Sequence, residues 1–479
     1  MNAEQVKQQC KQREKHLIAI KTFGCTFNQA DSLYMQKLLE KNGFKTVHIS
    51  FVGEHGRKAV QELQSVNPDV IVLNSCTVKT ISENKLFRAL NQIQSFNKAF
   101  NKQVKVIITG CVPQANPEYV DVYFKNYSVI GTKALDNIVK AVQAELQDKH
   151  FVDLKLSKPE RLKFCLLKNK VIDIIPISEG CTGACYFCKT KQARFNVHSN
   201  PVKQILQHIN LLLKNYNVKE FWITSQDLGA YGLDINTSLP QLLNEIKNFK
   251  QMFLVRLGMI NPQHLLAYGK QIANALKDLH FFKFLHVPVQ SGSEHVVKTM
   301  NRPHTVKEFL QALKLVKQYL QNFTLATDII VGYPTETEQD FEETLKLLKH
   351  VKPDIVNVSK YWPRPKTIAS KLKPLPTEIV KQRSKIASQL SLEIGFENNK
   401  KFLNKELVVL IDEVSGFKTL KARALNYKQV VLEDCFDKKM LGLFARVKIT
   451  SVTSIDLRGY VLETLNINTA QEFERFFKI

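Results

Sequence analysis

The sequence predicts an α/β protein in three parts: an N-terminal parallel α/β domain, a central partial barrel of the TIM type and a small antiparallel β-barrel at the C-terminal end. A chain of 479 residues is long enough for about three domains. Up to residue 397, apolar β-branched runs alternate with helical patterns, which is typical of parallel sheets with crossover helices. Beyond that point five short strand patterns follow one another, as in small OB-like barrels. We expect the domains to span 14–147, 166–398 and 400–464.

The N-terminal part carries three cysteines that each follow a predicted strand. The strands are expected at 16–22, 70–73 and 104–108, and the cysteines after them are Cys25, Cys76 and Cys111. Because the carboxyl ends of parallel strands lie along one edge of a sheet, we expect these cysteines to converge in space. The small residues beside them, Gly24, Ser75 and Gly110, leave room for a bound cluster. The alternative is that they are three small, buried core residues.

A second group of three cysteines lies within one loop. Cys181, Cys185 and Cys188 have C-x3-C-x2-C spacing directly after the predicted strand 171–177. Three thiolates can hold three irons of a [4Fe–4S] cluster and leave the fourth iron open. A structural zinc site would need four ligands, and no fourth Cys or His stands at the spacing of a zinc finger. The spacing therefore favours a cluster over three free core cysteines.

The central part is expected to contain six parallel strands, at 171–177, 219–225, 252–258, 282–289, 324–332 and 354–361. Barrels of this type carry their chemistry at the carboxyl ends of the strands. The polar candidates there are Thr224, Ser225, Gln226, Asp227, Arg256, His286, Gln290 and Asp328. Taken singly, each is more often a core or capping residue, but together they indicate the lining of a pocket. The charged segment 148–170 is interpreted as a linker between the first two domains.

The charge balance favours a polyanionic partner. The net charge is +24, and from Lys360 to Ile479 there are 22 Lys and Arg against 13 Asp and Glu. Such an excess favours nucleic acid first and an acidic membrane second. Small basic β-barrels commonly bind single-stranded or looped RNA. The alternative is a general enrichment in lysine that serves solubility.

The cysteine usage indicates a reducing compartment. There are nine cysteines, an odd number, and the first fifteen residues contain no apolar core of a signal peptide. We therefore expect a cytoplasmic protein, and the low acidity of the N-terminus leaves organelle import open. No apolar run is long enough for a membrane-spanning helix.

From residue 16 to 463 the chain resembles the methylthiotransferases of the radical S-adenosylmethionine (SAM) superfamily. The motifs that carry the resemblance are the loop 181–188 with Phe187, and the stretches 23–32, 74–78, 109–111, 222–232, 286–293 and 326–337. The stretches 188–191 and 224–232 most resemble the eukaryotic and archaeal branch. Enzymes of that branch methylthiolate N6-threonylcarbamoyladenosine beside the tRNA anticodon.

The resemblance implies two [4Fe–4S] clusters and SAM as cofactors. Cys181, Cys185 and Cys188 would hold the cluster that cleaves SAM. Cys25, Cys76 and Cys111 would hold an auxiliary cluster that carries the sulfur. The residues that would line the cofactor site are Phe187, Ser225, Gln226, Asp227, Arg256, His286, Gln290 and Asp328.

The resemblance also implies partners. The C-terminal barrel would be a TRAM domain, which is associated with tRNA binding, and the substrate would be the anticodon loop of tRNA. The electron donor would be of the flavodoxin or ferredoxin type, or a reductase, and the enzyme would act as a monomer. Lys189, Lys191 and Arg194 either meet the SAM carboxylate or an RNA phosphate, or form a solvated basic loop.

Three alternatives to this function stay open. Isopentenyladenosine in tRNA is a second substrate used within the family, and a ribosomal-protein aspartate is a third; the strong positive charge favours RNA over a basic protein. A non-enzymatic RNA-binding module would not need six cysteines in register.

Two positions depart from the family pattern. Lys366 stands where a Pro-Gly-Thr turn has glycine, and Gln226 stands where an acidic residue is common.

Overall fold

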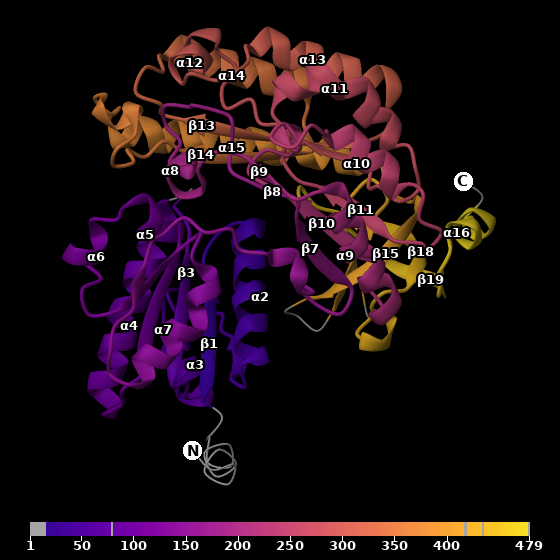
Figure 1. The fold of residues 1–479 in the computed structure, drawn as a ribbon. Helices are drawn as coiled ribbons and strands as arrows, with labels where there is room; N and C mark the ends of the chain where they lie inside the picture. The colour runs from indigo at the N-terminus through magenta and orange to yellow at the C-terminus, as the bar shows by residue number, and fades with distance from the viewer. Residues whose placement is uncertain (1–15, 78–79, 416–418, 434, 478–479) are drawn as a thin grey trace. The chain divides into compact units, whose positions relative to one another are not determined.

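The computed structural model describes residues 16–77, 80–415, 419–433 and 435–477. The chain divides into two compact units (Figure 1). The first unit comprises the residues up to Leu166 together with Gln192–Phe195, and the second comprises Leu167–Lys191 together with the residues from Asn196 onward. The segment 192–195 follows the second cysteine loop in sequence and yet belongs to the first unit.

The first unit is built on a parallel sheet with the strand order β2-β1-β3-β4-β5-β6. Its strands are β1 (Leu17–Thr22), β2 (Lys45–His48), β3 (Val70–Ser75), β4 (Lys105–Gly110), β5 (Ser128–Gly131) and β6 (Val152–Asp153). Every residue of β3 is buried, because this strand lies inside the sheet and is covered on both faces. The predicted parallel α/β domain is confirmed. Strands β2, β5 and β6 were not predicted, and each is too short to show a strong apolar pattern.

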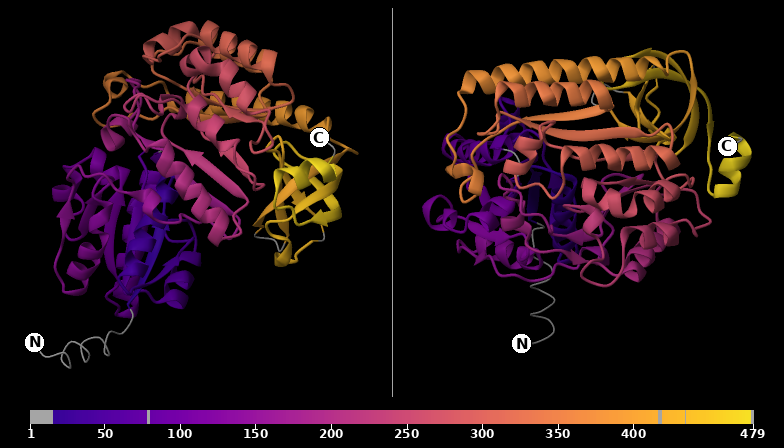
Figure 2. Two further views of the ribbon diagram at one scale, coloured as in Figure 1. Left: turned by 45° about the vertical axis from the view of Figure 1, so that its right-hand side comes forward. Right: turned by 90° about the horizontal axis from the view of Figure 1, so that it is seen from above.

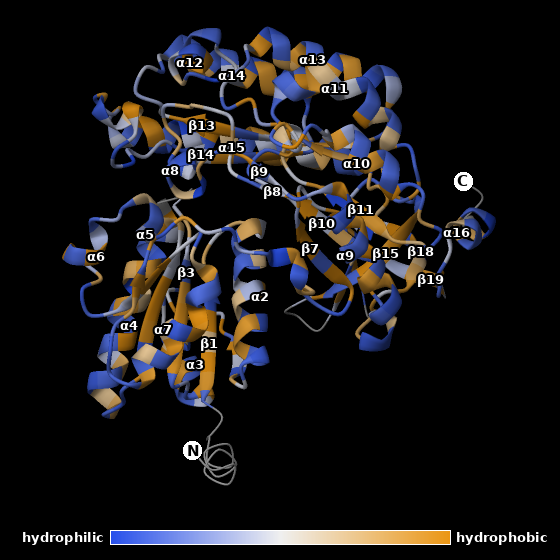
Figure 3. Ribbon diagram, in the orientation of Figure 1, coloured by the Kyte–Doolittle hydropathy of each residue, from blue (hydrophilic) through white to orange (hydrophobic). Residues whose placement is uncertain are grey.

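Helices cover this sheet on both faces. On one face, α3 (Lys58–Val66) and α4 (Thr80–Phe100) pack onto apolar residues of β1, β3 and β4. On the other, α2 (Thr26–Lys41) and α7 (Ile138–Leu146) contact the strands and each other. The short helices α5 (Cys111–Ala115) and α6 (Tyr119–Val122) follow β4. Figure 3 shows the apolar strands enclosed by helices of mixed polarity, as burial of one helical face requires.

The segment 148–170 is not the linker that its charge suggested. Its strand β6 pairs in parallel with β5, so it completes the edge of the sheet. The side chain of Arg161 is buried, and its Nε donates to Asp31 Oδ1 of α2 at 2.7 Å. The segment up to Leu166 is held by strand pairing and by this ion pair, neither of which produces an apolar pattern in the sequence.

The second unit begins with two three-stranded parallel sheets that form a partial barrel. One has the order β11-β10-β7 and the other β12-β13-β14. The strands are β7 (Ile172–Pro176), β10 (Glu220–Thr224), β11 (Leu254–Leu257), β12 (Phe284–His286), β13 (Thr324–Val331) and β14 (Ile355–Lys360). Isolated parallel bridges join the sheets, at Val255–Phe281 and Met259–His286. All six predicted strands are confirmed, in sequential order around the partial barrel.

The crossover helices of this unit are α9 (Val202–Asn215), α10 (Leu239–Ile246), α11 (Pro262–Ala275), α12 (Glu294–Thr299), α13 (Val306–Tyr319), α14 (Glu338–Val351) and α15 (Thr377–Lys400). Two of them begin with a capping box, Thr305 with Glu308 and Thr337 with Asp340, which satisfies the first free N–H groups of the helix. The long helix α15 packs along β14 and reaches the C-terminal barrel (Figure 2). Within the described part of the chain, no helix is both long and apolar enough to span a bilayer.

The cysteine loop of this unit is enclosed by a short hairpin. Strands β8 (Ser178–Glu179) and β9 (His198–Ser199) pair in antiparallel fashion, and the helix α8 (Thr190–Arg194) lies between them in the chain. The hairpin closes both ends of the segment that carries the three cysteines.

The C-terminal part is a closed five-stranded barrel with the order β15-β16-β17-β19-β18, followed by the helix α16 (Ala470–Phe477). The strands are β15 (Glu406–Val414), β16 (Leu420–Ala424), β17 (Gln429–Leu432), β18 (Phe444–Val452) and β19 (Leu457–Leu465). Alternate residues point inward and form one apolar core. The predicted small β-barrel is confirmed, and its closure includes one parallel pair, β17 with β19.

A charged cluster joins the C-terminal barrel to the partial barrel. Asp412 is fully buried, and its Oδ2 lies 3.4 Å from Arg423 Nε. Burial, followed by the charge of Glu220, raises the pKa of Asp412 well above its usual range. The neighbouring Glu413 behaves in the opposite way. Although burial acts against it, a hydrogen bond from Lys168 lowers the pKa of Glu413.

The two carboxylates lead to opposite expectations for stability. A raised folded pKa means that the folded state holds a proton that the unfolded chain releases, so stability falls as the pH rises from about 3.9 towards the folded pKa. We expect the stability of Asp412→Asn to depend less on pH over this range. Its midpoint of thermal unfolding at pH 8 should be higher than that of the parent protein. The control Glu413→Gln should lower the midpoint at pH 8, because that carboxylate stabilises the fold when it is ionised. A decrease in Asp412→Asn as large as that in Glu413→Gln would contradict the assignment.

Candidate active site

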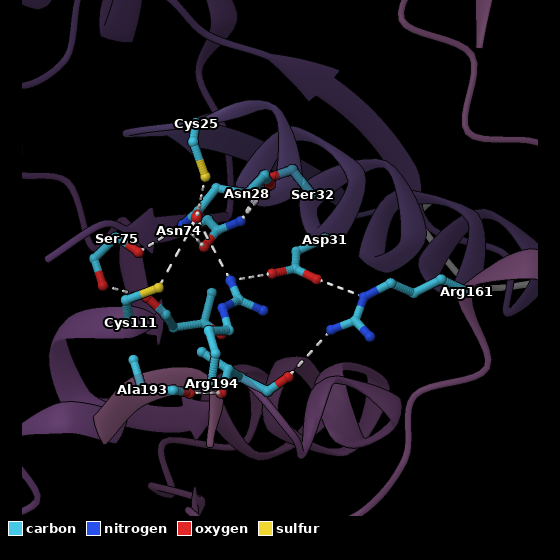
Figure 4. A network of polar contacts seen from close by, with 12 residues as sticks. Cys25, Asn28, Asp31, Ser32, Asn74, Ser75, Cys111, Arg161, Ala193 and Arg194 are labelled. Carbon is cyan, nitrogen blue, oxygen red and sulfur yellow. Dashed lines mark hydrogen bonds and ion pairs between the residues drawn. The ribbon is translucent and has the colours of Figure 1, made fainter. Parts of the chain in front are cut away.

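The three strand-end cysteines converge at the carboxyl edge of the first sheet: Cys25 and Cys111 approach each other (Figure 4), and Cys76 is hydrogen-bonded to Cys25. Asn28, on the first turn of α2, lies between them. Its Oδ1 accepts from Cys25 Sγ at 3.4 Å and from Cys111 Sγ at 3.9 Å, and its Nδ2 donates to the Ser75 carbonyl at 2.7 Å. The predicted convergence is therefore present in the structure.

Two glycines allow this close approach. Gly24 has φ +129°, and a Cβ there would lie 2.8 Å from Cys76 Sγ. Gly110 has φ +93°, and a Cβ there would lie 2.4 Å from the Ser75 carbonyl oxygen. Both positions combine a left-handed backbone with no space for a side chain, so glycine is required at each. The small residues that the sequence placed beside the cysteines thus let the thiols meet.

The local electrostatics differ between these thiols. A hydrogen bond with Cys76 lowers the pKa of Cys25 to about 6, and the Arg194 charge adds to the lowering. Burial raises the pKa of Cys111, and the Arg194 charge acts in the opposite direction. A positive charge thus lies near enough to favour the thiolate form of both cysteines, as iron ligation requires.

The loop of Cys181, Cys185 and Cys188 presents its sulfurs to hydrogen-bond donors. The Gly183 N–H donates to Cys181 Sγ at 3.2 Å, and the Thr190 N–H donates to Cys188 Sγ at 3.4 Å. The third sulfur, of Cys185, receives a guanidinium N–H at 3.3 Å. Hydrogen bonds to sulfur stabilise thiolate ligands and set the potential of a cluster.

As free thiols, Cys181 and Cys185 are predominantly neutral. Burial raises the pKa of Cys181 to about 11, and it raises the pKa of Cys185 as well. Coordination deprotonates a thiol outright, so the three sulfurs with their N–H donors fit a metal cluster. Among the described residues, no three His, Cys, Asp or Glu side chains approach closely enough to hold a single metal ion. A cluster takes one thiolate at each iron, so its ligands need not meet at one point.

A chain of polar contacts supports Cys185 from the barrel. The Arg302 guanidinium that donates to its sulfur also donates to Asn261 Oδ1 at 2.6 Å. Asn261 in turn donates through Nδ2 to Asp227 at 2.7 Å. Burial opposes ionisation of Asp227, but hydrogen bonds from His264 and Asn261 lower its pKa. Asp227 was predicted to bind the cofactor, and here its carboxylate supports the loop that orients Arg302.

The other predicted residues take several positions. Gln226 Oε1 accepts from the Gly180 N–H at 2.6 Å and so fixes the start of the cysteine loop. Ser225 Oγ accepts from the Asp227 N–H at 3.0 Å. Phe187 packs against an apolar cluster that includes Met300 and Tyr333, and thereby anchors the end of the loop.

Three further candidates are His286, which ends β12, Asp328 of β13 and Gln290, which follows β12 in the chain. His286 Nε2 is 3.0 Å from Asp328 Oδ2, and both side chains remain partly exposed. Gln290 has φ +76°, a strained conformation for a residue with a side chain, and its N–H donates to the Asp328 carbonyl at 2.9 Å. His286 and Asp328 are thus partly accessible to solvent, whereas Gln290 is buried.

Arg256 does not join this group. Its guanidinium carbon lies 5.4, 5.7 and 5.5 Å from the ring centres of Trp222, Phe284 and Tyr427. Tyr427 belongs to the C-terminal barrel, so Arg256 contributes to the contact between the two barrels. Arg256 lies near the end of its strand, as predicted, but the direction of its side chain is set by the tertiary fold.

Two of the three basic residues after Cys188 are buried rather than solvated. Lys189 is 3 % exposed, and its Nζ donates to the Pro365 carbonyl at 2.9 Å. Arg194 is 1 % exposed and pairs with Asp31 at 2.6 Å within the first unit. Lys366 has φ +64°, so it adopts the left-handed backbone for which glycine is usual in this turn.

Comparison with known proteins agrees with this geometry. The model of the radical SAM superfamily matches residues 175–348, and that of the uncharacterized protein family UPF0004 matches residues 17–131. A probable threonylcarbamoyladenosine tRNA methylthiotransferase of Pyrococcus horikoshii is 34 % identical over 449 residues, which is 93 % of this chain and 99 % of the relative. The chain belongs to the threonylcarbamoyladenosine tRNA methylthiotransferase family.

Other members of this family come from eukaryotes. The threonylcarbamoyladenosine tRNA methylthiotransferase of Homo sapiens is 34 % identical over 425 residues, which cover 87 % of this chain and 69 % of the relative. Among solved structures, the radical SAM methyltransferase TsrM from Kitasatospora setae matches with a TM-score of 0.53 at 11 % identity, over 74 % of each chain. The cobalamin-dependent enzyme OxsB matches with 0.51 at 14 % identity, over 80 % of this chain and 57 % of that one. These two likenesses show the fold.

Membership of a methylthiotransferase family with a radical SAM domain implies SAM and [4Fe–4S] clusters as cofactors. Sequence reasoning did not single out four of the residues that support the candidate ligands: Asn28, Asp31, Asn261 and Arg302. The spacing of Asn28 and Asp31 places both on one face of α2, which is a signal that could have been used. Arg302 and Asn261 had no such signal, since their partners are distant in sequence.

Proposed function

We propose that this protein transfers a methylthio group to C2 of N6-threonylcarbamoyladenosine beside the anticodon of tRNA. The observation that carries the proposal is the presence of two separate three-cysteine sites in one chain. One such site suffices for SAM cleavage, so the second supports a further role, the provision of sulfur. The archaeal and human relatives bear the name of this activity.

We assign Cys181, Cys185 and Cys188 to the cluster that cleaves SAM, and Cys25, Cys76 and Cys111 to the auxiliary cluster. When bound, the clusters supply the electron that generates a 5′-deoxyadenosyl radical and the open iron that carries the sulfur. Radical chemistry suits the target, because an aromatic C–H of adenine resists acid–base attack. Cofactor contacts fall to the partly exposed His286 and Asp328 and to Gln290 at the carboxyl end of the partial barrel.

The chain's own residues hold these groups in place. The backbone N–H groups of Gly183 and Thr190 and the Arg302 guanidinium donate to the three sulfurs of the second loop. Gln226 holds the start of that loop, and Asp227 holds Asn261, which orients Arg302. In the first unit, Asn28 Oδ1 accepts from the Cys25 and Cys111 thiols.

The proposed reaction requires two partners, the tRNA substrate and an electron donor. A net charge of +24 favours an RNA substrate, and a base in a single-stranded loop can be turned out towards an active site. The C-terminal barrel, of the kind found in TRAM domains, would contact the anticodon arm. The donor would be of the flavodoxin or ferredoxin type, or a reductase, and the enzyme would act as a cytoplasmic monomer.

Nucleoside mass spectrometry tests the proposal directly. The reconstituted protein would be incubated under anaerobic conditions with SAM, dithionite and tRNA that carries threonylcarbamoyladenosine. We expect a 2-methylthio derivative of that nucleoside, and tRNA without the threonylcarbamoyl group serves as the control. Formation of 5′-deoxyadenosine without the new nucleoside would redirect the search to isopentenyladenosine and then to a ribosomal-protein aspartate. Failure of all three substrates would refute the proposal.

A further inference from the structure

A buried group of two arginines and one aspartate lies beside the strand-end cysteines (Figure 4). Asp31 is fully buried, and its two oxygens accept from Arg161 Nε at 2.7 Å and from an Arg194 terminal nitrogen at 2.6 Å. The guanidinium carbons of both arginines also lie over the Phe27 ring, at 5.1 and 4.8 Å from its centre.

The two arginines face different neighbours. Arg194 also donates to Asn28 Oδ1 at 3.5 Å, the same oxygen that accepts from the Cys25 and Cys111 thiols. Arg161 is directed to the other oxygen of Asp31 and to the Thr132 carbonyl at 3.4 Å. Figure 4 shows Arg161 on the far side of Asp31 from the cysteines. Arg194 is therefore the arginine whose charge faces the thiols.

The positive charge of Arg194 lies near the Cys25 and Cys111 thiols, because all three groups donate to the same oxygen of Asn28. A [4Fe–4S] cluster held by three thiolates is anionic, and it gains a further negative charge on reduction. The charge of Arg194 is opposite in sign to that of such a cluster. Charge and hydrogen bonding to the ligands are two of the factors that set a cluster's reduction potential.

We propose that Arg194 is a positioning residue of the auxiliary cluster: its guanidinium, which shares the Asn28 Oδ1 acceptor with the Cys25 and Cys111 thiols, stabilises the negative charge of the bound cluster. The inference rests on the proposed function, because it takes Cys25, Cys76 and Cys111 as ligands. It assigns a role in the first unit to a residue that follows Cys188 by six positions in the sequence. Arg161 supports Asp31 without sharing this role.

The test isolates the auxiliary cluster in the full-length chain. Cys181, Cys185 and Cys188 are replaced by alanine, and the protein is reconstituted with iron and sulfide. The midpoint potential is then measured by redox titration with electron paramagnetic resonance. Iron content is measured in parallel. In this background we compare Arg194→Met with the matched control Arg161→Met, which also removes one partner of Asp31.

We expect Arg194→Met to lower the reduction equilibrium constant at least tenfold, which corresponds to a shift of about 59 mV towards negative potential for one electron. Arg161→Met should change it by less than threefold, although both variants should lose similar stability in the protein without iron. Arg194→Lys keeps the charge and should restore most of the potential. If Arg194→Met does not retain iron, Arg194→Gln against Arg194→Lys makes the same comparison.

Equal shifts in the two methionine variants, or no shift in either, would overturn the assignment of Arg194. A lysine variant that behaves like the neutral variants would also overturn it, since charge would then not be the operative property. Absence of iron from the triple-alanine background itself would point elsewhere. That result would contradict the assignment of an auxiliary cluster, and therefore the proposed function on which the inference rests.

Discussion

Cys181→Ala is expected to abolish SAM cleavage altogether. The three sulfurs of this loop leave no spare ligand, since each would bind one iron and the fourth iron must stay open for SAM. Loss of one thiolate therefore removes the cluster or closes the open position. The measurement is 5′-deoxyadenosine formation under reducing conditions, and we expect it to fall by at least three orders of magnitude, which is about 4 kcal/mol of transition-state free energy.

Cys76→Ala provides the contrasting control for the first site. It should leave SAM cleavage intact but uncoupled, with no methylthio group in the tRNA. The reason is that Cys76 lies with Cys25 in the first unit, away in sequence from the loop that cleaves SAM. Methylthiolation of tRNA by either variant would show that the two-cluster assignment is wrong.

Asp31→Asn should cause the largest loss of stability among single substitutions in the first unit. Asp31 is fully buried and is paired with two buried arginines. The neutral amide leaves two guanidinium groups without their shared counter-charge, and removal of one partner from a buried ion pair costs about 3–5 kcal/mol. The measurement is the free energy of unfolding in urea for the protein without iron.

A matched substitution at the surface separates this effect from a general effect of amidation. Glu40→Gln removes a carboxylate that pairs with Lys37 at 2.9 Å on the exposed side of α2. Exposed pairs contribute about 0–1 kcal/mol, so this variant should unfold close to the parent. A loss in Asp31→Asn no greater than that in Glu40→Gln would contradict the buried-pair interpretation.

The candidate cluster ligands could be identified in the sequence because their signals are local. Cys181, Cys185 and Cys188 share one loop, and their spacing alone indicates an iron–sulfur site. Cys25, Cys76 and Cys111 are far apart in the chain, but each follows a strand pattern. Parallel strands bring their carboxyl ends to one edge, so the pattern predicted the convergence that the structure shows.

The pocket residues were less predictable because a strand-end position does not determine what a side chain contacts. Arg256 ends β11 as expected, but it lies among aromatic rings, one of which comes from the C-terminal barrel. Asp227 was expected at the cofactor, and its carboxylate accepts from Asn261, a partner that no local pattern indicates. The segment 148–170 was interpreted as a linker because it is charged, and the ion pair that holds it to α2 leaves no periodic pattern in the sequence.

The sequence by itself determined the fold class, the family and the six cysteines, because apolar periodicity and residue spacing are properties of neighbouring positions. Only the tertiary structure decided which charges support those cysteines. The sequence placed Arg194 in a basic loop that either meets the SAM carboxylate or an RNA phosphate or is solvated, yet Arg194 is buried against Asp31, 163 positions earlier in the chain. The energy of a charged side chain depends on burial and on its partners in space. A contact between positions so far apart is made by the fold, and no local pattern encodes it.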